Sequence, residues 1–371
     1  MRVIVSGGGT GGHIYPALAI ADGILARHSG AQVLYVGTGS GLEHDIVPRR
    51  GYHFYAISGA GLARRFTPRN LVAVLRATRG FAAAWSLIGR FAPDVVVGTG
   101  GYVCGPVVLA AVCRRVPTLI HEQNAFPGLT NRLLARYASC TALTFPEAVR
   151  YLPHGARVRL TGLPVRPEFL AVRRDEARSR LGLGETFTVV SFGGSRGARS
   201  LNCAMVEVCR VLQNDRGVRL YHATGLNEHE AFLRALAQAQ VPLPGSQNIV
   251  IAPYFYEIAG LLAAADLVIC RAGASTIAEI TVLGLPSILV PYPFATGNHQ
   301  EHNAQALARS GAAVVIRDRD LTGEALLHVL NELRRDTARR RRMADAARAL
   351  GRPNALDRLL DIIDGLARRK S

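Results

Sequence analysis

The sequence predicts an α/β protein with two Rossmann-like domains, each built on a parallel sheet. An apolar run that ends in a glycine-rich turn and leads into a helical stretch opens the chain at residues 2–13 and returns at residues 187–198. The length of 371 residues is sufficient for two domains that each bury a core. Because open parallel sheets bind ligands at the carboxyl ends of their strands, we expect the two domains to face a central cleft.

The composition indicates a folded, basic protein. Hydrophobic residues make up 49% and charged residues 19%, which leaves little room for disorder. The net charge of +17 comes almost entirely from arginine, since Lys370 is the only lysine. A basic surface favours phosphates and anionic lipid headgroups. No RNP, zinc or helix-turn-helix pattern appears, so nucleic acid is not an expected partner. The six cysteines form no C-x-x-C pair and most lie in apolar runs, which is typical of reduced thiols in a cytosolic protein.

The first glycine-rich turn raises a dinucleotide hypothesis. Gly7, Gly9 and Gly12 match the G-x-G-x-x-G pattern. Dinucleotide binding needs an acidic residue at the end of the second strand to hold a ribose. The expected second strand, residues 32–36, ends in residues 37–39, which contain no acid. Nicotinamide binding is therefore only a minor alternative.

His13 lies at the start of the helix that follows this turn. The positive end of a helix dipole favours a neutral imidazole, which is the form that a general base requires. The same position also suits a residue that caps the loop or orients a phosphate. The spacing leaves both roles open.

Two stretches of the first half have membrane-like composition. Residues 95–113 are apolar, but glycine and proline turns interrupt them, which predicts a strand, a turn and a buried helix. Residues 58–91 interleave arginines with apolar side chains that include Leu71, Leu75, Phe81 and Trp85. This second stretch suits either a helix seated at a membrane surface or an ordinary amphipathic helix that packs on the sheet. A polar cluster at residues 121–124, directly after another apolar run, indicates a site.

The domain boundaries follow from the linker-like residues 161–166. We expect an N-terminal domain at residues 1–165 and a C-terminal domain at residues 166–345. Residues 346–371 are expected to form a C-terminal helix that packs back on the first domain.

Residues 267–303 carry the pattern of a ligand-binding α/β unit. A strand at residues 267–270 leads through a small-residue turn into a helix, whose first N–H groups can hold phosphate. Glu279 can accept hydrogen bonds from a ribose diol, or it can complete a capping box with Thr276. Gln300 and Asn303 can bind sugar hydroxyls.

Five motifs follow one another along the chain in the order found in the MurG family of peptidoglycan glycosyltransferases, which this sequence resembles. They are GGTGGH at residues 8–13, GTGGY at 98–102, HEQN at 121–124, GGSxGA at 193–198 and RxGAxTxxE at 271–279. The resemblance implies the GT-B fold, two Rossmann-like domains about a cleft. Residues 1–165 would then be the acceptor and membrane domain, and residues 166–345 the UDP-sugar donor domain. It also implies inverting transfer of N-acetylglucosamine from UDP-N-acetylglucosamine to the muramyl sugar of lipid I, which forms lipid II. A related GT-B enzyme with another lipid acceptor, or a UDP-N-acetylglucosamine epimerase, is the alternative.

The resemblance also implies roles for individual residues. His13 is the candidate general base, and the candidates for the acceptor diphosphate are Gly9, Gly100, Gly101 and Tyr102. The implied substrate-binding residues are Thr10, Gly11, Gly12, Asn124, Arg166, Ser195, Phe255, Ala274, Ser275, Thr276, Ile277, Ala278, Glu279 and Gln300. The chain departs from the family pattern at Leu163, where Asn is usual, and at Arg196, where Gln is usual. Arg196 adds a positive charge near the expected diphosphate.

The expected chemistry needs no cofactor and no metal ion. No Asp-x-Asp metal motif is present, and helix N-termini together with arginine can stabilise a leaving diphosphate. The family predicts peripheral attachment to the cytoplasmic face of the bacterial plasma membrane, on an anionic surface. Cell-wall or cell-division proteins are possible partners.

Overall fold

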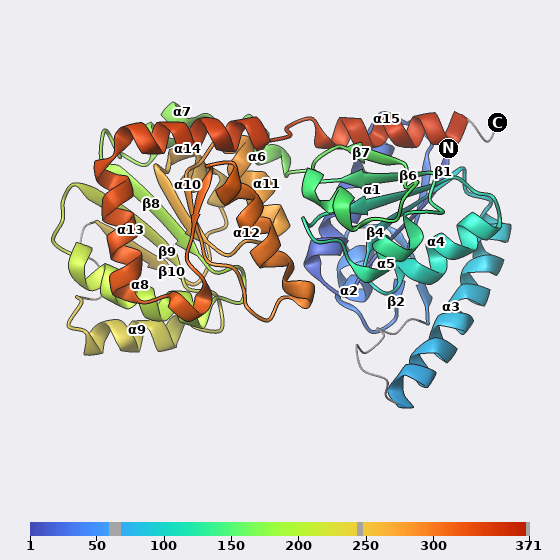
Figure 1. The fold of residues 1–371 in the computed structure, drawn as a ribbon, viewed down its shortest axis with the longest axis horizontal. Helices are drawn as coiled ribbons and strands as arrows, with labels where there is room; N and C mark the ends of the chain where they lie inside the picture. The colour runs from blue at the N-terminus through green and yellow to red at the C-terminus, as the bar shows by residue number, and fades with distance from the viewer. Residues whose placement is uncertain (59–67, 243–247, 369–371) are drawn as a thin grey trace. The chain divides into compact units, whose positions relative to one another are not determined.

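The computed structural model describes residues 1–58, 68–242 and 248–368, without the side chains of residues 68–74. The chain divides into two compact units. Unit 1 contains Met1–Pro164 and Pro353–Ser371, and unit 2 contains Val165–Arg352. Each unit carries its own parallel sheet with helices on both faces (Figure 1).

Unit 1 is built on a seven-stranded sheet with the strand order β3-β2-β1-β4-β5-β6-β7. All pairs in this sheet are parallel. The strands are β1 Arg2–Gly7, β2 Gln32–Thr38, β3 His53–Ile57, β4 Val95–Gly100, β5 Thr118–Glu122, β6 Cys140–Leu143 and β7 Val158–Leu160. The helices are α1 Gly11–Arg27, α2 Leu42–Arg49, α3 Pro68–Phe91, α4 Cys104–Cys113, α5 Leu129–Leu134, the 3-10 helix η1 Pro146–Tyr151 and α15 Ala355–Arg368.

The alternation of side chains along β1 builds two cores in unit 1. Val3 and Val5 pack on one face of the sheet with α1, α2 and α15. Ile4 points to the other face and packs with α3 and α4. Successive side chains of a strand point to opposite faces, so a continuous apolar run is what a sheet covered on both sides requires.

Unit 2 is built on a six-stranded sheet with the order β10-β9-β8-β11-β12-β13, again with parallel pairs. Its strands are β8 Phe187–Phe192, β9 Val218–Ala223, β10 Ile249–Ala252, β11 Leu267–Cys270, β12 Ser287–Leu289 and β13 Ala313–Val315. Its α-helices are α6 Pro167–Ala171, α7 Arg174–Arg180, α8 Arg199–Leu212, α9 His229–Gln238, α10 Ile258–Ala264, α11 Ala274–Leu283, α12 His299–Arg309, α13 Gly323–Arg335 and α14 Thr337–Leu350. Two short 3-10 helices are η2 Thr296–Asn298 and η3 Asp318–Asp320.

The strand orders place the glycine turns of each unit next to one another. In unit 1 the order reverses between β1 and β4, and in unit 2 it reverses between β8 and β11. These are topological switch points, where open α/β sheets bind ligands outside the carboxyl ends of the strands. The turns after β1 and β4 therefore share one switch point, and the turns after β8 and β11 share the other. The expected parallel α/β architecture is confirmed in both halves.

The last helix of the chain belongs to unit 1. Helix α14 ends at Leu350, and Pro353 follows at the point where the chain passes from unit 2 to unit 1. Helix α15 then lies along α1, where Leu359 and Ile363 are fully buried (Figure 1). On its polar side Arg27 of α1 pairs with Asp357, at 3.0 Å, and with Asp361, at 2.6 Å.

The two stretches of membrane-like composition have different structures. Residues 95–113 form β4 and α4, as predicted. The stretch at residues 58–91 contributes α3, in which Leu87 and Ile88 are buried against the sheet, while Leu75 and Trp85 are 54% and 39% exposed. The side chain of Leu71 lies outside the described residues. Within the part of the chain that the structure describes, no helix combines the length and apolar character of a membrane span.

Candidate functional site

The first glycine loop joins β1 to α1 and is held by a buried carboxylate. Thr10 is the N-cap of α1, and Gly11, Gly12 and His13 form its first turn. The N–H of Gly9 donates to Glu43 Oε2 at 3.1 Å. The N–H of Gly8 donates to the carbonyl oxygen of Gly100 at 3.3 Å. The backbone N–H of Gly9 is thus already occupied, which leaves the start of α1 as the N–H source for an anion in this loop.

Glu43 corrects the sequence-based description of the second strand. No acid stands at the end of β2 in the sequence, yet Glu43 of α2 folds back onto that end. Its Oε1 accepts from the N–H of Thr38 at 3.1 Å and from its hydroxyl at 2.7 Å. The Glu43 side chain is fully buried. Because the carboxylate is enclosed and satisfied by the protein, it is not available to a ribose, and dinucleotide binding remains unsupported.

The second glycine loop, after β4, lies directly against the first. Gly100 and Gly101 have φ values of +110° and +83°. A methyl group at Gly101 would lie 2.3 Å from the carbonyl oxygen of Gly8, so only glycine fits there. Tyr102 follows and lies beside Gly9. The structure therefore brings the four candidate residues for the acceptor diphosphate into one place.

The His13 ring is hydrogen-bonded to the end of β4 and to the residue that follows β5. Its Nδ1 lies 3.0 Å from the carbonyl oxygen of Thr99 and 3.1 Å from Oε1 of Gln123. The Gln123 amide nitrogen donates to the same Thr99 carbonyl at 2.7 Å. Gln123 and Thr99 are buried, whereas the His13 side chain is half-buried. A half-buried imidazole on a buried polar support has the placement that a general base needs.

The polar cluster at residues 121–124 is only partly a surface feature. His121 and Glu122 are the last residues of β5 and are buried, which corrects the interpretation of the whole cluster as a site. Glu122 accepts from the N–H of Asn124 at 2.9 Å and from the N–H of Gly128 at 3.0 Å. It also accepts from the Asn131 side chain at 2.8 Å. The Glu122 carboxylate thereby fixes the loop that presents the half-buried Asn124.

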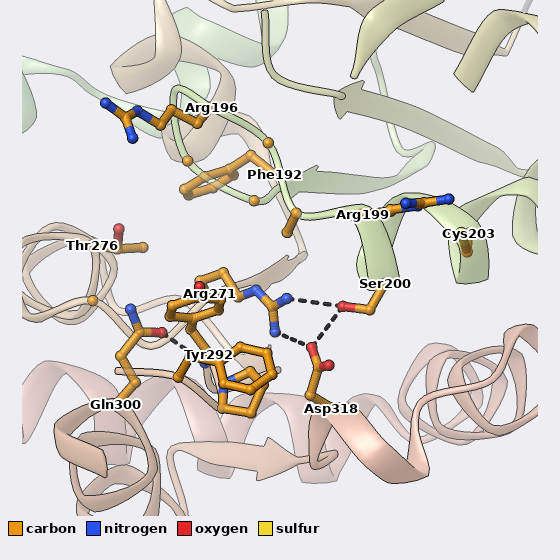
Figure 2. A pocket seen from close by; sticks show the side chains of 17 residues that line it. Phe192, Arg196, Arg199, Ser200, Cys203, Arg271, Thr276, Tyr292, Gln300 and Asp318 are labelled. Carbon is orange, nitrogen blue, oxygen red and sulfur yellow. Dashed lines mark hydrogen bonds and ion pairs between the residues drawn. The ribbon is translucent and has the colours of Figure 1, made fainter. Parts of the chain in front are cut away.

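Unit 2 contains a pocket of about 850 Å³ at its switch point. The turn after β8 supplies Gly193, Gly194 and Arg196 to its wall, and the turn after β11 supplies Gly273. Thr276 of α11 and Gln300 of α12 line the same pocket (Figure 2). Gln300 accepts from the N–H of Tyr292 at 3.0 Å through Oε1, so its amide nitrogen remains for a ligand. Ser195, Phe255, Glu279 and Arg166 do not line this pocket.

A network around Arg271 holds the floor of this pocket (Figure 2). Arg271 donates to Ser200 Oγ at 2.9 Å and to Asp318 Oδ1 at 2.5 Å. Ser200 in turn donates to Asp318 at 2.6 Å. Arg271 also donates to the carbonyl oxygens of Val290 and Pro291. The guanidinium thus joins the ends of β11 and β12 to the start of α8. The sequence motif contained Arg271, but no local pattern pointed to Ser200 or Asp318.

Glu279 is paired with Arg166 and is not a helix cap. Helix α11 begins at Ala274 after the N-cap Gly273, so Thr276 lies inside the helix and the capping-box interpretation is wrong. Arg166 Nε donates to Glu279 Oε1 at 3.1 Å. Burial raises the pKa of the Glu279 carboxyl, and the Arg166 guanidinium opposes that shift. A mostly buried carboxylate near a strand end, with an arginine as its partner, suits a ligand with hydroxyl groups.

The other donor candidates have mixed placements. Ser195 is exposed in the turn after β8, and its carbonyl oxygen accepts from the N–H of Leu226 at 3.2 Å. Phe255 follows β10 and its ring packs edge-on against Tyr221. Ser275, Ile277 and Ala278 lie in the first turns of α11. Asn303 is fully buried and donates to the carbonyl oxygen of Ala272, so the expectation that it binds sugar hydroxyls is wrong.

The structure offers no cluster for a metal ion among the residues it describes. Within those ranges no group of three or more His, Cys, Asp or Glu side chains is placed to coordinate one.

The two Rossmann-like units with glycine turns at their switch points have the architecture of the GT-B fold, and two family models identify the protein as a glycosyltransferase. The glycosyltransferase family 28 N-terminal domain matches residues 3–143, and the corresponding C-terminal domain matches residues 188–359. The solved structure of Acinetobacter baumannii MurG has a TM-score of 0.81 and 30% identity, covering 98% of this chain and 99% of that one. The chain belongs to the MurG family.

Relatives of high identity cover the whole chain. One from Desulforudis audaxviator strain MP104C is 62% identical over 368 residues, 99% of both chains. One from Desulforamulus reducens is 50% identical over 371 residues. Both are named UDP-N-acetylglucosamine–N-acetylmuramyl-(pentapeptide) pyrophosphoryl-undecaprenol N-acetylglucosamine transferase. A UDP-N-acetylglucosamine 2-epimerase, at 12% identity and a TM-score of 0.64, shares the fold alone.

The role of Glu43 in the first glycine loop leads to a prediction on stability. In Glu43→Gln one side-chain oxygen becomes an amide nitrogen, which faces the N–H of Gly9 or the donors of Thr38. We expect the free energy of unfolding to fall by about 1–3 kcal/mol, the cost of an unsatisfied buried polar group. Chemical denaturation followed by tryptophan fluorescence measures it, because Trp85 is the only tryptophan and lies in unit 1.

Asp45→Asn is the matched control, since Asp45 is exposed on the same helix. Equal unfolding midpoints for the two variants would contradict the assigned role of Glu43.

Proposed function

We propose that the enzyme transfers N-acetylglucosamine, with inversion, from UDP-N-acetylglucosamine to the muramyl sugar of lipid I, forming lipid II for peptidoglycan synthesis. The observation that carries this proposal is the 62% identity, over 99% of both chains, to a relative named for that transfer. The alternative, an epimerase or a related enzyme with another acceptor, rests on likeness of fold alone.

The donor is assigned to unit 2. Uridine binds beside Phe255, in the loop that follows β10, and the mostly buried Glu279 carboxylate accepts from the ribose hydroxyls. The diphosphate binds at the start of α11, at Ala274 and Ser275, and beside Ser195 and Arg196. Helix N-termini and guanidinium groups both favour phosphate. The remaining residues of the donor site are Arg166, Thr276, Ile277, Ala278 and Gln300.

The acceptor is assigned to unit 1. Its diphosphate lies at the paired glycine loops, beside Gly9, Gly100, Gly101 and Tyr102, and accepts hydrogen bonds from the N–H groups at the start of α1. Thr10, Gly11, Gly12 and Asn124 border the sugars. The start of α1 supplies N–H donors and Asn124 supplies a side-chain amide, and none of the residues named here is a carboxylate, which suits an anionic acceptor.

His13 acts as the general base in this proposal. The hydroxyl of the muramyl sugar gives its proton to the imidazole while its oxygen forms a bond to the anomeric carbon of the donor. The bond between that carbon and the diphosphate oxygen breaks, and UDP leaves with the electron pair. Direct displacement at one carbon inverts its configuration, and no carboxylate nucleophile is needed.

Peripheral attachment to the cytoplasmic face of the plasma membrane is part of the proposal, because the acceptor is lipid-linked. Leu75 and Trp85 are exposed on α3, and the guanidinium of Arg114 lies 4.4 Å from the centre of the Trp85 ring. Apolar side chains beside arginine suit the interface of an anionic bilayer. In the cell this activity serves cell-wall biogenesis and division, in contact with other proteins of those processes.

Donor binding predicts the effect of Glu279→Ala. Loss of the carboxylate that accepts from the ribose should weaken UDP-N-acetylglucosamine by about 1–3 kcal/mol. Isothermal titration measures this change. Glu168→Ala is the control, since Glu168 also pairs with Arg166, at 3.1 Å, but is half exposed. If both variants bind the donor as the wild type does, Glu279 does not contact it.

Transfer itself is measured as UDP release and product formation with UDP-N-acetylglucosamine and a lipid I analogue. In this assay His13→Ala should lower turnover by roughly 100-fold or more, because general bases contribute at least that much, while donor affinity barely changes. His53→Ala, at an exposed position in the same unit, is the control. If the wild type does not release UDP in an acceptor-dependent way, the proposed function is refuted. If only His13→Ala keeps full turnover, the function stands and the role of His13 as the general base is refuted.

Membrane attachment predicts flotation with vesicles that contain anionic lipid, at low salt and less at high salt, because exposed charges are screened. Leu75→Gln should reduce the floating fraction. Leu226→Gln should not, although Leu226 is 63% exposed, because it lies in unit 2. A wild-type protein that remains at the bottom of the gradient at low salt would overturn this part of the proposal.

A further inference from the structure

The proton on the His13 ring is fixed by the groups around Nδ1. The carbonyl oxygen of Thr99, 3.0 Å from Nδ1, can only accept a hydrogen bond. Nδ1 must therefore carry a hydrogen whenever this contact is made. In the neutral ring the single hydrogen then lies on Nδ1, and Nε2 has the free lone pair.

The orientation of the Gln123 amide is determined by the same reasoning. Its nitrogen lies 2.7 Å from the carbonyl oxygen of Thr99 and 3.0 Å from that of His121. Exchange of the amide oxygen and nitrogen would set an oxygen against two carbonyl oxygens, which is repulsive. Gln123 Oε1 therefore faces His13 and accepts from Nδ1–H, at 3.1 Å.

His121 fixes the far end of the chain of hydrogen bonds. Its Nε2 lies 2.9 Å from the carbonyl oxygen of Gly162, so Nε2 carries the hydrogen and donates. Its Nδ1 then accepts from the Gln123 amide nitrogen, at 3.1 Å. The ring is fully buried, and burial lowers the pKa of His121 to about 4, so it is neutral near pH 7. Only one arrangement of the hydrogens in this network therefore gives every donor an acceptor.

We propose that Gln123, held by His121 and by the Thr99 carbonyl, is a positioning residue that fixes His13 as the Nδ1–H tautomer and leaves Nε2 to take the proton of the acceptor hydroxyl. Nε2 has no hydrogen-bond partner among the residues that the structure describes. This inference rests on the proposed role of His13 as the base. Gln123 itself touches neither substrate.

The partners of His13 are neutral, unlike the carboxylate that orients the histidine of a catalytic triad. An amide oxygen and a peptide carbonyl select the tautomer without adding a full negative charge beside the ring. When Nε2 takes up the proton, both acceptors remain on Nδ1–H and stabilise the imidazolium that forms. The network thus orients the ring in both protonation states.

The tautomer is measured directly in the wild-type enzyme at neutral pH, free of substrates. Nitrogen-15 labelled histidine and long-range proton–nitrogen NMR distinguish a protonated from an unprotonated ring nitrogen, and His13→Gln assigns the signals. We expect Nδ1 of His13 protonated and Nε2 unprotonated. A neutral His13 protonated mainly on Nε2 overturns the proposal. This measurement does not depend on activity, so failure of the transfer reaction is distinguished from failure of the network.

Turnover provides the second test, with Gln123→Met, which keeps the length of the side chain but removes its donor and acceptor. We expect kcat to fall roughly tenfold or more, because a general base contributes roughly 100-fold or more and the variant should lose part of this contribution. The KM values for both substrates should remain within about twofold of those of the wild type. The Nδ1–H fraction of His13 should also fall.

Thr141→Val is the matched control for this variant. Thr141 is buried in the adjacent strand β6 and pairs with Ile120 of β5, and its hydroxyl has no hydrogen-bond partner among the described residues. It therefore perturbs the same sheet without touching His13. A turnover of Gln123→Met equal to that of Thr141→Val overturns the proposal. If Gln123→Met does not fold, the NMR measurement of the His13 tautomer in the wild-type enzyme tests the proposal alone.

Discussion

The close approach of two glycine loops is the constraint on which unit 1 depends. The loops after β1 and β4 touch through their backbones, with the N–H of Gly8 on the carbonyl oxygen of Gly100. A side chain at Gly101 would separate them. This contact also brings the first turn of α1 over the end of β4, so His13 reaches the carbonyl oxygen of Thr99. One backbone contact therefore sets both the surface proposed to bind the acceptor diphosphate and the position of the proposed base.

Unit 2 repeats this constraint with different partners. The turn after β8 meets the turn after β9, where a methyl group at Gly225 would lie 2.0 Å from the nitrogen of Gly197. The ends of β11 and β12 are instead joined by a side chain, Arg271, through carbonyl oxygens and Asp318. Unit 2 thus combines a close glycine contact after β8 and β9 with a pocket of about 850 Å³ after β8 and β11.

The periodicity of the sequence predicts the fold well, because strands, turns and helices are local patterns. The turn at residues 271–273 follows a buried strand, as expected, whereas the turn expected at residues 98–101 begins only after Gly100, the last residue of β4. What the sequence does not predict is the direction of polar side chains across the fold. Ser200 and Asp318 meet although 118 residues separate them. Glu43 returns to a strand end that has no acid of its own, and Asn303 turns inward to a carbonyl. Such contacts depend on strand order, which no local pattern contains.

The distribution of buried charge in unit 1 accounts for the identity of the neighbours of His13. Among the described residues its two fully buried carboxylates are Glu43 and Glu122, and each accepts from two backbone N–H groups and from neighbouring polar side chains. Both carboxylates hold loops in place through these hydrogen bonds, and neither one is hydrogen-bonded to the imidazole of His13. In the proposed mechanism a carboxylate on Nδ1 would raise the basicity of the ring and add negative charge near the anionic acceptor, and both effects oppose a neutral base beside a diphosphate. An amide and a peptide carbonyl orient the ring and avoid both effects, so a glutamine beside His13 fits the proposed base better than a carboxylate does.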